Sequence, residues 1–350
     1  MIAPDSFKGS IGAAAAASAI AEGWRSVRHD DEIRMLPQAD GGEGTLAAIA
    51  SAVAGSEFHA AGDVTGPDGR PVPGRWLQLP DGTAVVELAQ SSGLPLMAAP
   101  DPLGATTRGL GEVIRAALDD GASALVIGLG GSASTDGGAG ALAALGLGLF
   151  DTAGLPIGDG GGELARLASI DSSALRAVPT RLLSDVTAPL LGPTGAAAVF
   201  GPQKGASPDD VHALDAALAQ FAALLGGDPS TPGAGAAGGA GYGFHVAWGA
   251  RIESGAGAIA TLTGLVAEAA SADLLITGEG AFDATSLTGK VVGHALGRAS
   301  RTAVIAGALA TAPPDLGWSL TELAGSAEAA LADPARWLRE AGALAARVRL

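Results

Sequence analysis

The chain has 350 residues, a length that favours two domains over one compact core. Hydrophobic residues make up 48% of it and charged residues 16%, which argues against global disorder, and the net charge of −16 argues against nucleic acid or an anionic membrane as a partner. The absence of cysteine excludes disulfides and a thiolate nucleophile, and because the sequence shows neither a signal peptide nor a membrane-spanning apolar run, we expect a cytoplasmic protein.

Apolar runs alternate with helical stretches along the chain. The runs end in polar residues or glycines, at Asp5, Asp40, Gly130, Asp185, Glu279 and Gly307. Segments rich in Ala and Leu predict helices over 11–24, 44–53, 107–119, 209–225, 255–270, 290–299 and 334–348. This alternation predicts an α/β fold with mostly parallel sheet. Acids and glycines can simply form turns, but ligands bind at the carboxyl ends of such strands, so we expect these residues to share one site.

Two regions depart from this alternation. Residues 64–94 contain short apolar runs separated by turn residues at 67–69 and 80–82, which predicts a meander in a second domain with a mixed sheet. Residues 232–243 (PGAGAAGGAGYG) are locally repetitive, and we expect a flexible or ligand-hugging loop there. Ser10 is the expected N-cap of the first helix, and Ser207 is expected to begin another helix that carries acids in its first turn.

Two motifs lie in the first fifty residues. The stretch PDSFKGS places Asp5, Ser6 and Lys8 ahead of a helix, where Lys8 can hold a carboxylate or phosphate or can be an ordinary exposed lysine. The stretch ADGGEGT places Asp40 and Glu43 close together around two glycines. Two such acids repel one another unless a cation or substrate hydroxyls lie between them, although N-terminal capping of a helix explains them as well.

The stretch GLGGSASTDGGAG, residues 128–140, has the highest density of glycine and hydroxyl groups. Its backbone and side chains offer donors suited to phosphate oxygens. It also contains a G-x-G-x-x-A near match to a dinucleotide-binding motif, with Asp151 at about the spacing of a ribose-binding acid. The segment Thr135-Asp136-Gly137-Gly138 stands where the helix of that motif would already be running, which weakens the match.

The remaining motifs combine acids with lysines. The stretch TGEGAFDATSLTGK carries Glu279, Asp283 and Lys290, but Ala284 and Val291 break the P-loop pattern that its Gly-Lys pair suggests. The stretch from Leu183 to Ala206 brings Asp185 close in sequence to Lys204. Carboxylates, lysines and glycine or serine nests, without a histidine cluster, fit phosphoryl transfer better than acyl transfer or zinc hydrolysis. The residues therefore indicate a kinase or phosphotransferase that is not of the P-loop type.

The motifs APDSFKGS, ADGGEGT, GLGGSASTDGGAG, SDVTAPLLGPTGAAAVFGPQKGA, GAGAAGGAGYG and DLLITGEGAFDATSLTGK, in this order, resemble the bacterial glycerate kinase family. The resemblance implies phosphorylation of D-glycerate by ATP with Mg²⁺, and most bacterial members of this type give 2-phosphoglycerate. It also implies a flavodoxin-like α/β domain built from both chain ends, 1–60 and 265–350, with a second α/β domain, 61–264, inserted and the site in the cleft between them. Ser134-Thr135 and Ala188 depart from the Thr-Asn and Asn usual in the family.

We assign hypothetical roles to the matching residues. Asp185 would orient or deprotonate the acceptor hydroxyl, Lys204 would offset charge on the transferred phosphoryl group, and Lys8 would hold the glycerate carboxylate. The expected substrate-binding residues are Asp5, Ser6, Asp40 and Glu43. The expected nucleotide-binding residues are Gly130, Gly131, Ser132, Gly278 and Lys290. The expected Mg²⁺ ligands are Asp136, Glu279 and Asp283.

Other functions remain open at this point. The near match at Gly128–Ala133 leaves an NAD(P)-dependent hydroxyacid dehydrogenase as an alternative, and the departures from the family leave a kinase of a related small hydroxyacid. A sugar- or acid-binding protein without turnover is a third possibility. We expect a monomer or a homodimer.

Overall fold

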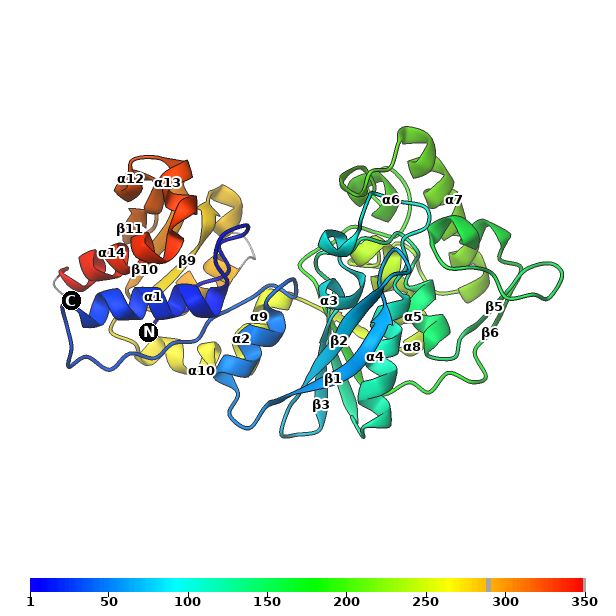
Figure 1. Cartoon of the computed structure of the whole chain (residues 1–350), viewed down its shortest axis with the longest axis horizontal. Helices are drawn as coiled ribbons and strands as arrows, with labels where there is room; N and C mark the ends of the chain where they lie inside the picture. The colour runs from blue at the N-terminus through cyan, green and yellow to red at the C-terminus, as the bar shows by residue number, and fades with distance from the viewer. Residues whose placement is uncertain (288–290, 349–350) are drawn as a thin grey trace. The chain divides into compact units, whose positions relative to one another are not determined.

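The computed structural model describes residues 1–287 and 291–348, which form two compact units (Figure 1). The first unit takes Met1–Asp40, Ala47–Ala54 and the described residues from Gly255 onward, and the second takes Gly41–Leu46 and Gly55–Ser254. Both units are α/β, and the first is built from the two chain ends with the second inserted, which confirms the predicted fold class. No helix in the described ranges is both long and apolar enough to cross a bilayer.

The first unit contains a parallel sheet. Its strands β9 (Leu275–Phe282), β10 (Thr302–Leu309) and β11 (Leu316–Ser319) lie in the order β11-β10-β9. Ile2 forms parallel bridges to Ile276 of β9 and to Met35, so two further segments extend the sheet beyond β9. Counted along the chain, the segments at Ile2, Met35, β9, β10 and β11 have the 2-1-3-4-5 order of flavodoxin-like folds.

Helices cover both faces of this sheet. On one face, α1 (Ala13–Arg25) and α14 (Pro334–Ala346) pack on Ile276 and Ile305. On the other, α9 (Gly255–Leu262), α10 (Leu265–Glu268) and α11 (Val291–Leu296) lie over Leu275 and Val304. Glycine allows α1 and α14 to approach closely, because a methyl group on Gly342 would lie 2.3 Å from the backbone oxygen of Ile20. The result is a three-layer unit whose strands are apolar on both sides, as parallel strands require.

The second unit contains a mixed sheet in the order β1-β2-β3-β4-β7-β8. The predicted meander is the antiparallel set β1 (Glu57–Thr65), β2 (Pro71–Gln78) and β3 (Thr83–Glu87), and its turns close at Gly69 and Gly82 as expected. From β3 onward the strands β4 (Ala124–Gly128), β7 (Thr180–Leu183) and β8 (Arg251–Glu253) are parallel. A small sheet pairs β5 (Gly148–Phe150) with β6 (Ser169–Asp171).

The core of the second unit forms where helices meet this sheet. Leu110 and Ile114 of α4 (Arg108–Asp119) pack with Leu142 of α5 (Ala139–Ala144) and with strand residues. Phe221 of α7 (Pro208–Leu225) and Tyr242 of α8 (Ala240–Trp248) belong to the same core. The remaining α-helices are α2 (Thr45–Ala52), α3 (Leu88–Ser92), α6 (Ala196–Phe200), α12 (Leu320–Ala324) and α13 (Ala327–Ala332). Short 3₁₀ turns include Pro202–Lys204, Ala236–Gly239 and Ala284–Leu287.

Two local predictions need correction. The expected flexible loop over 232–243 is instead largely buried, as the turn Ala236–Gly239 and the first part of α8. Its glycines allow close backbone packing, since a methyl group on Gly238 would lie 2.1 Å from the oxygen of Ser134. Ser10 is not the N-cap of α1, because Gly12 holds that position and the Ser10 hydroxyl donates to the oxygen of Phe7. Ser207 does cap α7, in a capping box with Asp210.

Candidate functional site

A pocket of about 480 Å³ opens at the carboxyl ends of the strands in the first unit. Asp5 follows the segment at Ile2, and Glu279 and Gly280 lie near the end of the adjacent strand β9. The neighbouring segments at Ile2 and β9 form the point where the strand order reverses, and ligands of open α/β sheets bind in the crevice there. The pocket brings together the predicted site residues Asp5, Ser6, Lys8, Asp40, Glu279 and Asp283.

Asp5 has a strongly perturbed pKa in this pocket. Burial raises the pKa of Asp5 to about 7, and the charge of Asp40 adds to the rise, with a smaller contribution from Glu279. The Ser6 amide, which donates to Asp5 Oδ1 at 2.7 Å, and the Lys8 ammonium partly offset it. A carboxyl with a pKa near neutrality can accept or share a proton with a bound hydroxyl at physiological pH. The polar side of the pocket is thus suited to a small molecule with hydroxyl groups.

The two predicted metal ligands in this pocket, Asp283 and Glu279, have different surroundings. Asp283 Oδ1 accepts from the amide of Thr285 at 2.7 Å and from its hydroxyl at 2.6 Å, so this oxygen holds the turn Ala284–Leu287. Glu279 lies in β9, half-buried on the pocket wall. No group of three acidic or histidine side chains in the described part of the chain is close enough to hold a metal by itself. One or two carboxylates suffice for Mg²⁺ when substrate phosphates and waters complete its coordination, so these residues fit that ion.

Lys204, which belongs to the second unit, is buried. Its side chain is 2% exposed, and its Nζ donates to Ser132 Oγ at 3.0 Å and to the oxygen of Ser134 at 2.5 Å. Burial lowers the pKa of Lys204 to about 8, and the charge of Asp136 partly offsets this. The ammonium is therefore attached to the loop after β4, the loop with the highest density of glycine and serine in the sequence.

Asp136 belongs to the same loop and is fully buried. Burial raises its pKa, and hydrogen bonds from Thr107, Gly138 and Gly140 oppose the rise. Both oxygens accept from protein donors, Oδ1 from Gly138 at 3.1 Å and Oδ2 from Thr107 and Gly140. This environment favours a structural role that joins α4 to α5 rather than the predicted metal ligation.

One of the predicted phosphate-binding amides is used by the protein itself. The Gly130 amide donates to the oxygen of Gly41 at 3.0 Å, and the oxygen of Gly131 accepts from Leu94. Gly278 lies inside β9, where its oxygen accepts from the Asp5 amide and an added methyl group would meet Ile305 at 1.9 Å. These glycines therefore explain close packing between strands and loops. Lys290 lies outside the described residues.

The last two predicted residues lie in the second unit. Asp185 follows β7, is exposed, and accepts at Oδ1 from the Ser254 hydroxyl at 2.8 Å. Glu43 is exposed, and its charge contributes to the raised pKa of the buried Glu87, for which burial is the main cause. Asp40 belongs to the first unit and Glu43 to the second, so the two acids of the ADGGEGT motif are divided between the units.

The sequence analysis missed the apolar side of the pocket. Leu320, Ala330 and Leu331 line it from α12 and α13, two helices that were not predicted, and Ala281 and Ala308 line it from β9 and β10. Ser319 and Ser326 cap the two helices, and this pair of serines ahead of Ala- and Leu-rich stretches was the available signal.

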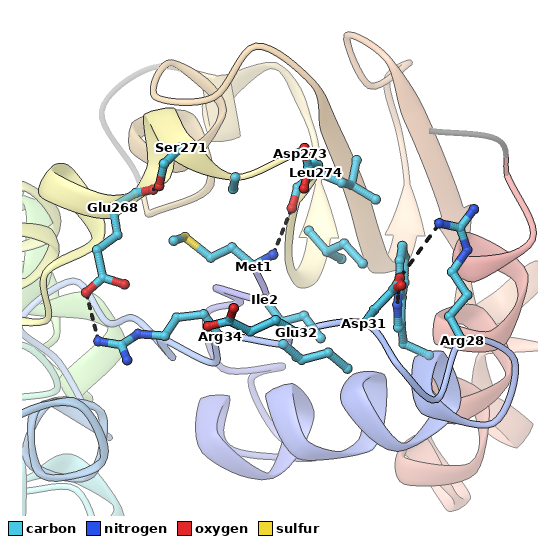
Figure 2. Close-up of a pocket in the computed structure, with 14 residues that line it drawn as sticks. Met1, Ile2, Arg28, Asp31, Glu32, Arg34, Glu268, Ser271, Asp273 and Leu274 are labelled. Atoms are coloured by element: carbon cyan, nitrogen blue, oxygen red, sulfur yellow. Dashed lines mark hydrogen bonds and ion pairs between the residues drawn. The ribbon is translucent and has the colours of Figure 1, made fainter.

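A second pocket of about 510 Å³ lies at the opposite, amino-terminal edge of the same sheet (Figure 2). The Met1 amine donates to the oxygen of Leu274 at 2.8 Å, and Arg34 pairs with Glu268 at 2.8 Å across the rim. Because ligands of such sheets gather at the carboxyl edge, the pocket containing Asp5 is the candidate site.

The chain thus combines an acidic, lysine-bearing pocket at the switch point of a flavodoxin-like unit with a second unit that contains a mixed sheet. The model of the glycerate kinase family matches residues 1–349, and the chain belongs to this family. It is 46% identical over 302 residues to the glycerate kinase of Bacillus subtilis. This match covers 83% of this chain and 78% of the relative. It is 45% identical over 303 residues to the glycerate 2-kinase of Escherichia coli, covering 83% and 79%.

A solved structure shares the fold. The crystal structure of a protein described as glycerate kinase 2 from Salmonella typhimurium LT2 has a TM-score of 0.85 and 39% identity. The likeness covers 99% of this chain and 96% of that one.

Proposed function

We propose that the protein phosphorylates D-glycerate with ATP and Mg²⁺ and that the product is 2-phosphoglycerate. The observation that carries the proposal is the pocket of the first unit, which gathers Asp5, Ser6, Lys8, Asp40, Glu279 and Asp283 in a member of the glycerate kinase family. The name of the relative from Escherichia coli, a glycerate 2-kinase, supports the choice of hydroxyl.

The acceptor is bound by charge and hydrogen bonds. Lys8 is exposed on the pocket wall and supplies a cation for the glycerate carboxylate. Asp5 and Asp40 accept hydrogen bonds from the two hydroxyl groups, which also relieves the repulsion between these two carboxylates. Ser6 can donate or accept, and Glu43 is assigned to the same substrate. This set would distinguish a hydroxyacid from an unsubstituted acid.

Mg²⁺ would be held by Glu279 and Asp283 together with phosphate oxygens of the nucleotide, as small hard cations prefer. When bound, it neutralises charge that develops on the phosphates. Asp136 remains a weaker candidate for this role, because its oxygens already accept hydrogen bonds from Thr107, Gly138 and Gly140.

Two residues of the second unit act on the transferred group in this proposal. Asp185 is exposed and takes the proton of the acceptor hydroxyl. Lys204 offsets charge on the phosphoryl group, and the loop with Gly130, Gly131 and Ser132 positions that ammonium through the bond from Nζ to Ser132 Oγ. Gly278 and Lys290 are the further residues assigned to the nucleotide.

The deciding experiment supplies ATP, Mg²⁺ and D-glycerate and identifies the product by phosphorus NMR. We expect ADP formation that depends on glycerate and a phosphorus resonance coupled to the single proton at carbon 2. A resonance coupled to the two protons at carbon 3 would refute the regiochemistry but keep the kinase. If the protein turned over another small hydroxyacid but not D-glycerate, that hydroxyacid would take the place of D-glycerate as the proposed acceptor.

The alternative of a dehydrogenase has less support from the geometry. In dinucleotide-binding motifs the helix follows the glycines directly and leaves amides for the pyrophosphate. Here α5 starts at Ala139, and the Gly130 amide is used by Gly41.

We propose that the protein is cytoplasmic and is a monomer or a homodimer. Light scattering in solution would test the oligomeric state.

A further inference from the structure

Glu87 is a buried carboxylate outside the set of residues proposed to bind substrate, nucleotide or Mg²⁺. It ends strand β3 and is only 2% exposed. One of its oxygens, Oε1, accepts from the backbone amide of Leu46 at 2.6 Å, and the other, Oε2, accepts from the side-chain amide of Gln90 at 2.9 Å. Because burial of a carboxylate without hydrogen bonds costs free energy, these two bonds keep Glu87 in place and fix its direction.

The bond to Leu46 holds the start of helix α2. The first amides of a helix have no partner within the helix, and a side-chain acceptor can satisfy one of them. For Leu46 this acceptor is Glu87, which lies 41 residues further along the chain. The Thr45 hydroxyl donates to the oxygen of Gly42 at 2.8 Å, so the residues just before the helix are tied to its first turn. Glu87 therefore fixes α2 together with the segment that leads into it.

This segment, Gly41–Leu46, lies across the ends of three neighbouring strands of the second unit. Glu87 of β3 pairs in register with Gly128 of β4, and Gly128 pairs with Leu183 of β7. A methyl group on Gly41 would lie 2.7 Å from the oxygen of Leu183, and one on Gly128 would lie 2.5 Å from the oxygen of Gly41. The three strands are parallel, so these contacts lie along their carboxyl edge, where ligands of such sheets bind.

Glu43 lies within this segment and close to Glu87. Burial is the main cause of the raised pKa of Glu87, and the negative charge of Glu43 adds to it, so the two carboxylates are near enough to repel. Gly42 and Gly44 flank Glu43, and glycine gives a backbone little stiffness of its own. The position of the Glu43 carboxylate thus depends on an anchor outside the motif.

We propose that Glu87 is a positioning residue for the acceptor: by holding the Leu46 amide it fixes the segment Gly41–Leu46 across the strand ends and so places the Glu43 carboxylate. This role rests on the proposed function, because Glu43 is a substrate ligand only there. Glu87 acts through Glu43 and does not touch the acceptor. A displacement of about 1 Å in a binding group can cost roughly 100-fold in rate, which is why the anchor matters.

The first test measures the kinetics of variants with D-glycerate as the acceptor. Glu87→Ala leaves the Leu46 amide unpaired, so KM for glycerate should rise at least about tenfold while kcat changes less. Glu87→Gln keeps a side-chain oxygen for that amide and should restore KM to within about threefold of the unchanged enzyme. Gln90→Ala is a milder second variant, because it removes one donor to Glu87 and leaves the carboxylate; its KM should rise about threefold.

Glu112 provides the matched control. Its carboxylate accepts from the amide of Thr65 at 2.6 Å and from the hydroxyl of Thr65 at 2.9 Å, a similar arrangement that ends on β1 instead of α2. Glu112→Ala should lower the stability and leave KM for glycerate unchanged. An unchanged KM in both Glu87→Ala and Gln90→Ala would overturn the proposal, as would an equal rise in Glu87→Ala and Glu112→Ala.

A second measurement needs no catalysis. Amide hydrogen exchange over residues 45–52 reports how firmly α2 is held, and it should be at least about tenfold faster in Glu87→Ala than in Glu112→Ala. Equal exchange in the two variants would overturn the anchoring role of Glu87 whatever the acceptor is. If the unchanged protein phosphorylated no hydroxyacid, the proposed function would fail and with it the role of Glu43, whereas faster exchange would still show that Glu87 anchors α2.

Discussion

Thr107 donates both its amide and its hydroxyl to one oxygen of Asp136, Oδ2, at distances of 2.9 and 2.7 Å. Thr107 is the N-cap of α4, and Asp136 lies just ahead of α5, so this carboxylate joins the starts of two helices. Asp136 also provides the negative charge that supports the Lys204 ammonium. A residue predicted to bind metal is thus placed to hold the loop that accepts hydrogen bonds from Lys204, a proposed catalytic residue.

Asp136→Asn is expected to lower the free energy of unfolding by about 3 kcal/mol, because the amide repels donors that the carboxylate accepts and leaves a buried ammonium without its counter-charge. Urea denaturation measures this change. Asp119→Asn, at an exposed position on α4, should stay within about 0.5 kcal/mol of the unchanged protein. Unaltered stability of Asp136→Asn combined with a higher Mg²⁺ requirement would restore the metal-binding role.

Asp5 makes the stability depend on pH. In the folded protein the Asp5 carboxyl keeps its proton up to about pH 7. In an unfolded chain the same carboxyl releases its proton near pH 4. The folded state therefore binds more protons in this window, and its stability falls as the pH rises from about 4 to 7. Asp5→Asn should remove this decline and gain up to about 4 kcal/mol above pH 7. Denaturation at several pH values checks it, with exposed Asp209→Asn as the control; an undiminished slope in Asp5→Asn would refute the assignment.

Lys204 makes the stability depend on pH in a more alkaline range. Its pKa of about 8 in the folded protein lies below the roughly 10.4 of an unfolded chain, so the unfolded state binds more protons in between and stability rises with pH there. Lys204→Met should abolish that rise. If the ammonium offsets phosphoryl charge, kcat should also fall by about 100-fold or more. Stopped assays across this pH range provide the measurement, and activity within a few-fold of the unchanged enzyme would exclude the catalytic role.

Asp185→Asn tests the proposed base. An amide cannot take a proton from the acceptor hydroxyl, so kcat should fall by about 100-fold or more while KM for glycerate changes little. Ser254→Ala removes the hydroxyl that donates to Asp185 Oδ1 and leaves the carboxylate. It should show a smaller loss, because only the orientation of the base is affected. A near-normal kcat in Asp185→Asn would move the base to another carboxylate.

Gly342→Ala tests the packing of α14 on α1. The new methyl group would lie 2.3 Å from the backbone oxygen of Ile20, so the helices must move apart. We expect a loss of about 1–3 kcal/mol of stability, measured by thermal and urea unfolding. Gly297→Ala is the control, because its methyl group would lie 3.7 Å from the oxygen of Gly293, an ordinary van der Waals distance. Equal stability of the two variants would show that the helix contact tolerates the change.

The sequence predicted the elements whose pattern is local. Helix α4 begins one residue after the predicted start, and α7 is capped by Ser207 as expected. Both could be predicted because the capping residues and the apolar spacing lie within one short stretch of chain. The six acidic and polar residues gathered in one pocket could likewise be anticipated, since strand ends of a parallel sheet meet at one edge.

What the sequence did not predict depends on contacts between distant segments. Gly130 and Gly278 were predicted to bind the nucleotide, and in the structure each also lies where two backbones pass closely, at Gly42 and at Ile305. A glycine required for packing and one required for a ligand have the same appearance in a sequence. The hydrogen bonds from Thr107 to Asp136 could not be predicted for a similar reason, because the two residues are far apart in the chain.

The pairing of Ile2 with Ile276 has a consequence for biosynthesis. The segment at Ile2 is translated before the second unit, yet its neighbour β9 follows only after the whole second unit. Contacts of such long sequence separation form slowly. The inserted unit can therefore acquire its structure on the nascent chain before the segment at Ile2 pairs with β9, so a ribosome stalled before β9 would leave the β9-facing edge of that segment exposed to chaperones.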